Sequence, residues 1–305
     1  MWLKILPEGS LGVLETERNS SNFGARSQMV RPCLRWAGSK RHLVQRILEL
    51  IPFPSHRYFE PMVGAGHLFF SLRAPRSIIS DANAELVNFY CVLRDSLDNM
   101  WEILQSYGRT KEDYYRVRNL NPKDPIERGA RFLYLNSLCW NGLYRVNSQG
   151  QFNVPYGNRR PEMLWDFENL RACSMALATA EIRNEDFEAL LEEYRPGVGD
   201  VVFLDPPYPR GSTCRKRKLG FNEYTVDGFT LEDHRRLARV ARRWGSAGAT
   251  IVVTEASHPE IIELFGSDFK VVEVESHSTI SGKSIGRRTV SEAILVYRGG
   301  GSFAI

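Results

Sequence analysis

The chain of 305 residues has an ordinary globular composition, with 43% hydrophobic and 25% charged residues. This balance excludes an intrinsically disordered chain and predicts a folded, soluble protein with one large domain, or one domain that carries an insertion. The 40 basic and 36 acidic side chains give a formal charge of +4 and a pI near 8.8, which permits nucleic acid as a partner without requiring it.

The five cysteines are odd in number and widely spaced, and no pair has the spacing of metal ligands. This pattern argues against a zinc site and a disulfide framework, and it favours free thiols in a reducing cytosol. No apolar run approaches the roughly 18 residues of a membrane span, and the first residues lack the features of a signal peptide. We therefore expect a cytoplasmic protein with no membrane segment and no metal.

Residues 1–30 mix glycine, serine, asparagine and charges without periodicity, which predicts a flexible N-terminal extension. After a tight stretch at 34–40, Leu43, Ile47 and Leu50 recur at helical spacing. A strand predicted at 57–60 then leads through a glycine turn into a helix. A second strand, at 77–80, ends at Asp81 and leads into another helix.

A mostly helical block follows, with helices predicted at 101–107, 126–138 and 164–177 and a polar, aromatic loop at 141–160. Strands return at 181–182, 201–204, 250–253, 270–274 and 293–297. Strands that alternate with helices are typical of a parallel-rich sheet covered on both faces. We therefore predict an α/β fold in which residues 31–95 and 178–305 form the sheet domain and residues 96–177 form an inserted helical subdomain.

The glycine turn contains Gly64 and Gly66, whose lack of a side chain allows a ligand to approach the backbone. Asp81 closes the next strand, where a carboxylate in this architecture accepts hydrogen bonds from a ribose. A dinucleotide motif would need another glycine near Phe69, so a nucleoside without a pyrophosphate, such as S-adenosylmethionine, fits better than NAD or FAD. Taken alone, these residues fit a steric turn followed by an aspartate helix cap equally well.

The strand predicted at 201–204 ends in Asp205-Pro206-Pro207-Tyr208, at the edge where open α/β sheets bind ligands. Adenine N6 is a poor nucleophile because its lone pair is delocalised into the ring. The Asp205 carboxylate and the rigidly aimed Pro206 carbonyl can accept hydrogen bonds from its two protons, while the Tyr208 ring holds the base flat. This chemistry needs no covalent intermediate and no metal. A strand ended by a Pro-Pro turn is the less specific alternative.

Over residues 33–298 the chain resembles the Dam-like family of DNA adenine methyltransferases. The stretches that carry the resemblance occur in the order of the family: Arg35-Trp36-Ala37-Gly38-Ser39-Lys40, Phe59-Glu60-Pro61-Met62-Val63-Gly64-Ala65-Gly66, Asp81-Ala82-Asn83, Asn141-Gly142-Leu143-Tyr144-Arg145, Phe152-Asn153-Val154-Pro155-Tyr156-Gly157, Asp205-Pro206-Pro207-Tyr208, Ser281-Gly282 and Arg287-Arg288. An ordered set of this kind is far more specific than any single motif.

The resemblance implies a Rossmann-like methyltransferase sheet and methyl transfer from S-adenosylmethionine to adenine N6 in double-stranded DNA. The catalytic residues would be Asp205, Pro206, Pro207 and Tyr208. The residues implied to bind the cofactor are Trp36, Lys40, Glu60, Gly64, Gly66, Asp81, Asp186, Phe187 and Asp205. The helical block at 96–177 would be a target-recognition subdomain.

Within that block, Arg145 is suited to reading a guanine edge in the major groove, although a phosphate contact or a plain surface position would also explain it. Asn141 and Leu143 can fill the gap that a flipped adenine leaves. Arg35 stands where well-known members carry lysine, and a short GATC-like target is the expectation. Further DNA contacts are expected from Pro155, Arg159, Arg287 and Arg288, and from Arg210, Arg215, Lys216, Arg217 and Lys218 in a basic loop after the catalytic motif.

Two other functions remain open at this stage. One is methylation of another planar amide or amine, such as an RNA base or a protein glutamine. Glutamine methyltransferases typically begin the motif with asparagine and do not need the 141–160 insertion. The other is a DNA-binding protein that has lost catalysis, against which the intact Asp205, Tyr208 and glycine turn argue. A monomer suits base flipping, and a cognate restriction endonuclease is a candidate partner.

Overall fold

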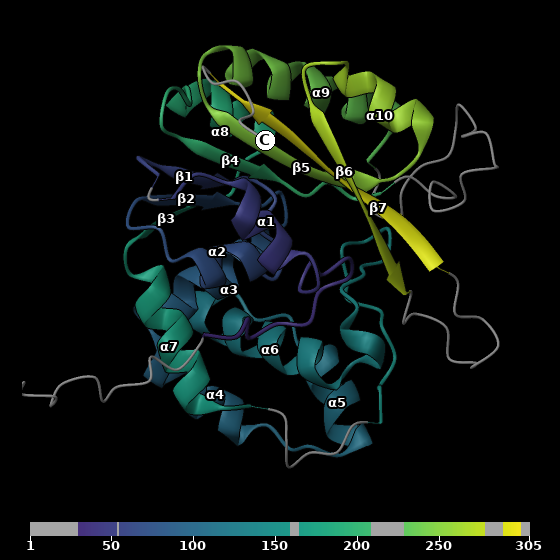
Figure 1. Cartoon of the computed structure of the whole chain (residues 1–305). Helices are drawn as coiled ribbons and strands as arrows, with labels where there is room; N and C mark the ends of the chain where they lie inside the picture. The colour runs from purple at the N-terminus through teal and green to yellow at the C-terminus, as the bar shows by residue number, and fades with distance from the viewer. Residues whose placement is uncertain (1–29, 54, 159–164, 209–228, 278–288, 300–305) are drawn as a thin grey trace, which may run out of the picture.

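A computed structural model gives the fold of the chain and describes residues 30–53, 55–158, 165–208, 229–277 and 289–299. Its centre is a seven-stranded sheet in the order β3-β2-β1-β4-β5-β7-β6 (Figure 1). In chain order the strands are β1 (Tyr58–Glu60), β2 (Ser77–Ser80), β3 (Ala180–Arg183), β4 (Val201–Leu204), β5 (Thr250–Ala256), β6 (Lys270–His277) and β7 (Thr289–Arg298).

Strands β3, β2, β1, β4 and β5 run parallel, and β7 lies antiparallel between β5 and β6. The chain moves outward in one direction from β1 to β2 and β3, and then returns to place β4 on the other side of β1. Open α/β sheets bind ligands at such a reversal, beyond the carboxyl ends of the strands. The segments that follow β1 and β4 are therefore neighbours at the edge where a site is expected.

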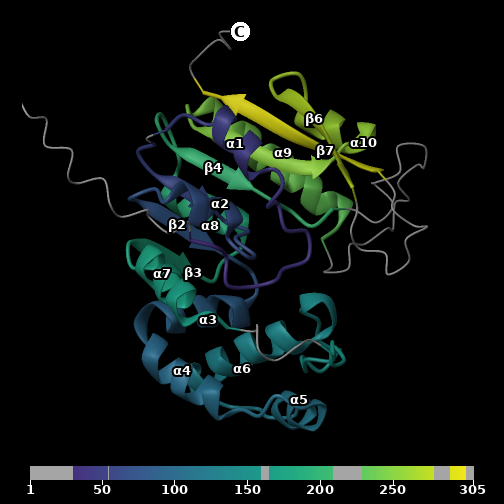
Figure 2. The same ribbon diagram turned by 60° about the horizontal axis from the view of Figure 1, so that its bottom comes forward.

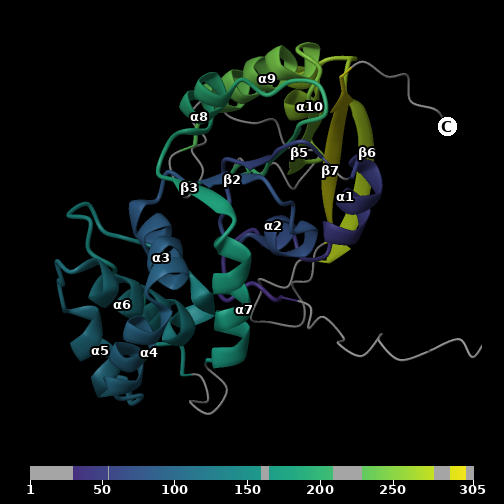
Figure 3. The same ribbon diagram turned by 90° about the vertical axis from the view of Figure 1, so that its left-hand side faces the viewer.

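Helices cover both faces of the sheet because its central strands are largely apolar, and all residues of β4 and β5 are buried. One face carries α8 (Phe187–Tyr194), α9 (Leu231–Ser246) and α10 (Pro259–Phe265). The other carries α1 (Val44–Leu50), α2 (His67–Leu72) and α3 (Ala84–Asp95). Figure 3 shows the sheet between these two layers.

A helical block extends from the second face and contains α4 (Leu97–Ser106), α5 (Lys111–Arg118), α6 (Pro125–Leu138), the short 3-10 helix η1 (Trp140–Gly142) and α7 (Phe167–Leu177). Helix α3 packs against α4, α6 and α7 as well as against β3. One apolar core therefore continues from the sheet into the block. Figure 2 shows α4, α5 and α6 below the sheet. The division at residues 95 and 96 stays a prediction, because α3 belongs to both sets of contacts.

The predicted α/β fold is confirmed, and each predicted strand is present. Helix α5 was not predicted, because its sequence is strongly polar and buries only Tyr114 and Val117. A capping box formed by Thr110 and Asp113 is the sequence signal that marks its start. Within the described part of the chain, no helix is both long enough and apolar enough to cross a membrane.

A buried polar pair, Glu255 and His234, lies between the carboxyl end of β5 and helix α9. Glu255 points toward α9, where its Oε1 lies 2.8 Å from Nδ1 of His234, and both side chains are fully buried. Thr254, the preceding residue, points to the other face of the sheet and donates a hydrogen bond to Asp205. The His234–Glu255 pair therefore supports the strand end that contacts Asp205.

We expect Glu255→Ala to lower the free energy of unfolding by about 3–5 kcal/mol, because it leaves His234 buried without this partner. The double variant His234→Gln/Glu255→Gln should lose clearly less, since two amides of suitable length can hydrogen-bond without a buried charge. Urea denaturation of the parent and both variants measures the difference. Equal losses in the single and double variants would show that the pairing itself contributes little.

Candidate active site

The glycine turn follows β1 and is held in a backbone conformation that favours glycine. Gly64 and Gly66 have φ values of +48° and +68°. A β-carbon added at position 64 would lie 2.8 Å from Cδ1 of Trp36, so the indole ring lies directly against the turn. The structure therefore requires glycine at position 64 for two reasons: the left-handed φ of this residue and the close approach of the Trp36 ring.

Asp81, at the end of β2, is bonded to this turn. Its Oδ2 accepts a hydrogen bond from the Gly64 amide at 3.1 Å, and its Oδ1 accepts one from the Asn83 amide at 2.9 Å. The Tyr90 hydroxyl donates to the Gly64 carbonyl at 2.7 Å. Because a carboxylate offers about four acceptor positions, Asp81 can hold the turn and still accept a hydrogen bond from a ligand.

Glu60 ends β1 and is almost completely buried. Its Oε2 accepts hydrogen bonds from the Tyr58 hydroxyl at 2.6 Å and from the Phe69 amide at 3.0 Å. Burial, with a smaller contribution from the charge of Asp205, raises the pKa of Glu60 to about 8. Phe69 stands where a dinucleotide-binding motif would need another glycine. Its backbone amide instead helps to hold the Glu60 carboxyl group in place.

Asp205 follows β4 and is held through one of its two oxygens. Oδ1 lies 2.8 Å from the Lys40 ammonium and accepts a hydrogen bond from the Thr254 hydroxyl at 2.6 Å. Its Oδ2 has no hydrogen-bond partner among the described residues. Burial raises the pKa of Asp205, and the charge of Lys40 opposes that shift. The arrangement keeps one carboxylate oxygen oriented and leaves the other available as an acceptor.

Tyr208 completes the predicted catalytic motif. The Lys40 ammonium lies 4.4 Å from the centroid of its ring, and the Tyr208 hydroxyl donates to Oε1 of Glu292 at 3.0 Å. Burial and the nearby charge of Asp205 raise the pKa of Tyr208 well above its ordinary value, so the hydroxyl remains a donor. Lys40 thus contacts both Asp205 and Tyr208, and also donates to the Gly38 carbonyl at 2.6 Å.

Trp36 connects this edge of the sheet to the predicted recognition loop. Its ring stacks on Tyr144 with centroids 5.9 Å apart and an interplanar angle of 21°. One residue earlier, the amide of Arg35 donates to Oδ1 of Asn136, and Nδ2 of Asn136 donates back to the Arg35 carbonyl, at 3.0 and 2.7 Å. A β-carbon at Gly142 would lie only 2.4 Å from that of Arg35. The structure thus brings together residues predicted for the cofactor and for DNA.

The loop predicted to take part in target recognition begins at Asn141, and isolated bridges join its two arms, Val146 with Phe152 and Cys139 with Tyr156. Near its start, Asn141 is exposed and has a φ of +55°, while Leu143 is half-buried. Arg145 is exposed, and its Nε donates to the Asn153 side chain at 2.7 Å. Pro155 is also exposed, and its carbonyl accepts a hydrogen bond from the Trp140 amide at 2.9 Å.

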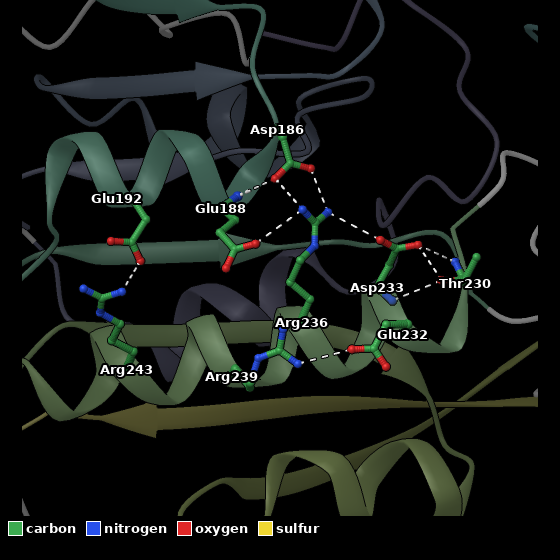
Figure 4. Close-up of polar contacts among 9 residues, drawn as sticks. All are labelled: Asp186, Glu188, Glu192, Thr230, Glu232, Asp233, Arg236, Arg239 and Arg243. Carbon is green, nitrogen blue, oxygen red and sulfur yellow. Dashed lines mark hydrogen bonds and ion pairs between the residues drawn. The ribbon is translucent and has the colours of Figure 1, made fainter.

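Asp186 and Phe187 stand apart from the contacts around Lys40. Asp186 caps α8 and forms a two-pronged ion pair with Arg236, at 3.1 and 2.9 Å (Figure 4). Phe187 is buried under the same guanidinium, 4.5 Å from the centroid of its ring. A hydrogen bond nevertheless joins this segment to the residue that follows β2, because Asn184 donates to the Asp81 carbonyl at 2.8 Å.

The residues of this site that were not predicted from the sequence include Thr254, Asn136, Trp140 and Glu292. Thr254 and Asn136 belong to a strand and a helix whose patterns indicate only core positions, and their partners are distant in sequence. Trp140 had a usable signal, because a tryptophan beside Asn141 in a polar loop is unusual, and its side chain is 50% exposed. The predicted DNA contacts that lie outside the described residues are Arg159, Arg210, Arg215, Lys216, Arg217, Lys218, Arg287 and Arg288.

No group of three or more histidine, cysteine, aspartate or glutamate side chains suited to hold a metal ion occurs among the described residues.

Comparison with known proteins gives the family of the chain. Residues 36–280 match the model of the D12 class N6 adenine-specific DNA methyltransferases. The Type II methyltransferase M1.LlaDCHI of Lactococcus lactis subsp. cremoris is 34% identical, over 88% of this chain and 96% of that protein. The Type II methyltransferase M.MjaIII of Methanocaldococcus jannaschii is 33% identical, over 88% and 98%. The DNA adenine methylase of Serratia marcescens is 29% identical, over 88% and 98%. The resemblance expected from the motifs is thereby confirmed, and the chain belongs to the D12 class of N6 adenine-specific DNA methyltransferases.

Proposed function

We propose that the protein transfers a methyl group from S-adenosylmethionine to N6 of an adenine that is flipped out of duplex DNA, within a short GATC-like site. The observation that carries the proposal is the hydrogen bonding of Asp205, whose Oδ1 is bonded to Lys40 and Thr254 while its Oδ2 is available as an acceptor. Two relatives are named Type II methyltransferases, which supports a cognate restriction endonuclease as a candidate partner.

The residues around the glycine turn fit S-adenosylmethionine by their chemistry. This donor carries a sulfonium cation, a ribose with two hydroxyl donors and a flat base, and when bound it supplies an electrophilic methyl group. The carboxyl groups of Glu60 and Asp81 suit a cation and a ribose, and the Trp36 ring offers an apolar surface against the turn. Asp186 and Phe187 are less direct candidates for the base, because Arg236 already pairs with the carboxylate.

For the adenine, the chain supplies two acceptors and one flat surface. Oδ2 of Asp205 and the carbonyl of Pro206 would accept the two N6 protons and draw the nitrogen toward tetrahedral geometry. Lys40 and Thr254 fix the carboxylate through its other oxygen, so orientation is established before the base arrives. The ring of Tyr208 would hold the base in plane. The carboxylate also stabilises the positive charge that develops on N6.

Recognition of DNA is proposed for the loop from η1 to Pro155 and for the neighbouring Arg35. Asn141 and Leu143 would occupy the space left by the flipped base, and Arg145 would contact a base edge. The half-exposed Trp140 joins this set as an aromatic surface next to Asn141. Asn136 is bonded to the Arg35 backbone and also donates to the Gly142 carbonyl at 3.4 Å, so it joins the two segments proposed to face DNA.

We expect Asp205→Asn to lower the rate of methyl transfer by roughly 10²–10³-fold, because an amide cannot supply the negative charge that stabilises the reacting nitrogen. Binding of DNA should persist. The assay incubates the protein with labelled S-adenosylmethionine and unmethylated duplex DNA and then identifies the modified base. Label that appears on protein alone would contradict the proposed reaction. Full activity in the Asp205→Asn variant would contradict the assignment of Asp205 as the catalytic carboxylate.

The proposed target predicts N6-methyladenine at GATC in DNA from cells that express the protein and lack other adenine methyltransferases. Genome-wide mapping of methylated adenines measures the sequence context directly. Cells that express the Asp205→Asn variant provide the background. Methylation confined to another motif would retain the reaction and reject the GATC assignment.

Gly64→Ala should weaken S-adenosylmethionine binding and lower the thermal midpoint, because the new methyl group displaces Trp36. Gly150→Ala is the matched control, since Gly150 also has a positive φ, +75°, but has nothing within 4 Å of an added β-carbon. Both variants carry the cost of a left-handed alanine, about 1–2 kcal/mol. Calorimetric titration and thermal unfolding compare them, and equal behaviour would mean that contact with Trp36 is not important.

A further inference from the structure

Tyr208 is held at both ends of its side chain. Its backbone follows two prolines, and its hydroxyl donates to Oε1 of Glu292 at 3.0 Å. The Lys40 ammonium lies over the ring, 4.4 Å from the centroid. A tyrosine ring can rotate about two side-chain bonds, so a hydrogen bond at its far end restricts the orientation of the whole ring. The identity and position of the acceptor therefore determine where the aromatic face lies.

Glu292 is a buried acid on β7, 6% exposed, at a position where the strand itself does not require a charge. The residues opposite it on the two neighbouring strands are the apolar Ala256 and Val274. A lone carboxylate is costly to bury. Glu292 nevertheless has both oxygens engaged, since Oε1 accepts from Tyr208 and Oε2 lies 2.6 Å from Nε2 of His42.

His42 lies two residues after Lys40 and has a half-exposed side chain, 44% accessible. The short segment that contains Lys40 and His42 thus acts on Tyr208 in two ways. Lys40 contacts the ring directly, and His42 acts indirectly through Glu292. The chain of contacts from His42 to Glu292 to Tyr208 therefore provides a firm support for a side chain at the reacting edge.

We propose that Glu292 is a positioning residue of methyl transfer, which fixes the plane of the Tyr208 ring for the target base while His42 holds its second oxygen. The proposal rests on the proposed role of Tyr208 as the surface that holds the adenine. Glu292 itself does not contact the reacting atoms. Its contribution should appear in the rate of the chemical step rather than in the affinity for DNA or for the methyl donor.

A double-mutant cycle with Tyr208→Phe and Glu292→Ala tests this role in single-turnover reactions at saturating S-adenosylmethionine. Tyr208→Phe keeps the ring and removes the hydroxyl, so each single variant should react about tenfold more slowly than the parent. If Glu292 acts through that hydroxyl, the double variant should be no slower than the slower single variant. Dissociation constants for DNA and donor should stay within about twofold of the parent.

Conservative and control variants separate positioning from folding. Glu292→Gln keeps a carbonyl acceptor and should retain a rate within about threefold of the parent. Glu275→Ala is the matched control, an exposed glutamate on the adjacent strand, and should leave the rate unchanged. Should Glu292→Ala fail to fold, His42→Ala replaces it in the cycle, with an expected loss of about threefold that disappears in the Tyr208→Phe background.

The outcomes also distinguish this proposal from the proposed role of Tyr208. Losses that multiply to about 100-fold in the double variant would overturn the action of Glu292 through Tyr208, as would a parent-like rate in Glu292→Ala. Tyr208→Ala removes the ring altogether and should be slower than Tyr208→Phe. If Tyr208→Ala reacts at the parent rate, the base-holding role of Tyr208 fails and the Glu292 proposal fails with it.

Discussion

A buried ion pair between Lys40 and Asp205 is the interaction on which the rest of the site depends. Nζ lies 2.8 Å from Oδ1, and the two side chains are 7% and 22% exposed. Burial favours the neutral form of a carboxyl group and raises the pKa of Asp205, whereas the adjacent ammonium lowers it. The ammonium group that favours the charged form of Asp205 thus belongs to a residue that comes from outside the sheet. The position of Lys40 is as important to the site as the motif itself.

The segment from Arg35 to His42 makes this possible by contacting three separate parts of the molecule. The Arg35 backbone is bonded to Asn136 on α6, Trp36 lies between the glycine turn and Tyr144, and Lys40 reaches β4. These partners are far apart in the sequence, yet the residues that meet them are separated by only a few positions. A shift of the segment would therefore alter the glycine turn, the contacts of Tyr144 and the position of Asp205 together. This coupling gives a physical reason for the helical block to pack closely on the sheet.

Local patterns were sufficient to predict the strands of the sheet and the carboxyl ends of β1, β2 and β4, whereas β5 and β6 each run three residues further than predicted. The apolar run of β4 followed by Asp205, and the glycine turn after β1, are contiguous signals whose chemistry can be read in place. The supporting residues could not be predicted in this way, because Thr254, Asn136 and Glu292 acquire their roles from partners 49 to 101 residues away in the chain. Helix α5 was missed for a different reason: its polar sequence gives little helical periodicity, and only its capping box marks it.

Carboxyl groups are crowded at this edge of the sheet, where Glu60, Glu255 and Glu292 lie near Asp205 and all three are buried. Burial raises the pKa of Glu60 to about 8, and the charge of Asp205 contributes in the same direction. In the protein alone, Glu60 is therefore mostly protonated at neutral pH, and the repulsion between the acids is reduced. A cation such as the sulfonium of the proposed donor favours the ionised form of a neighbouring carboxyl group. The site would thus acquire its full negative charge only when a positively charged ligand is present to balance it.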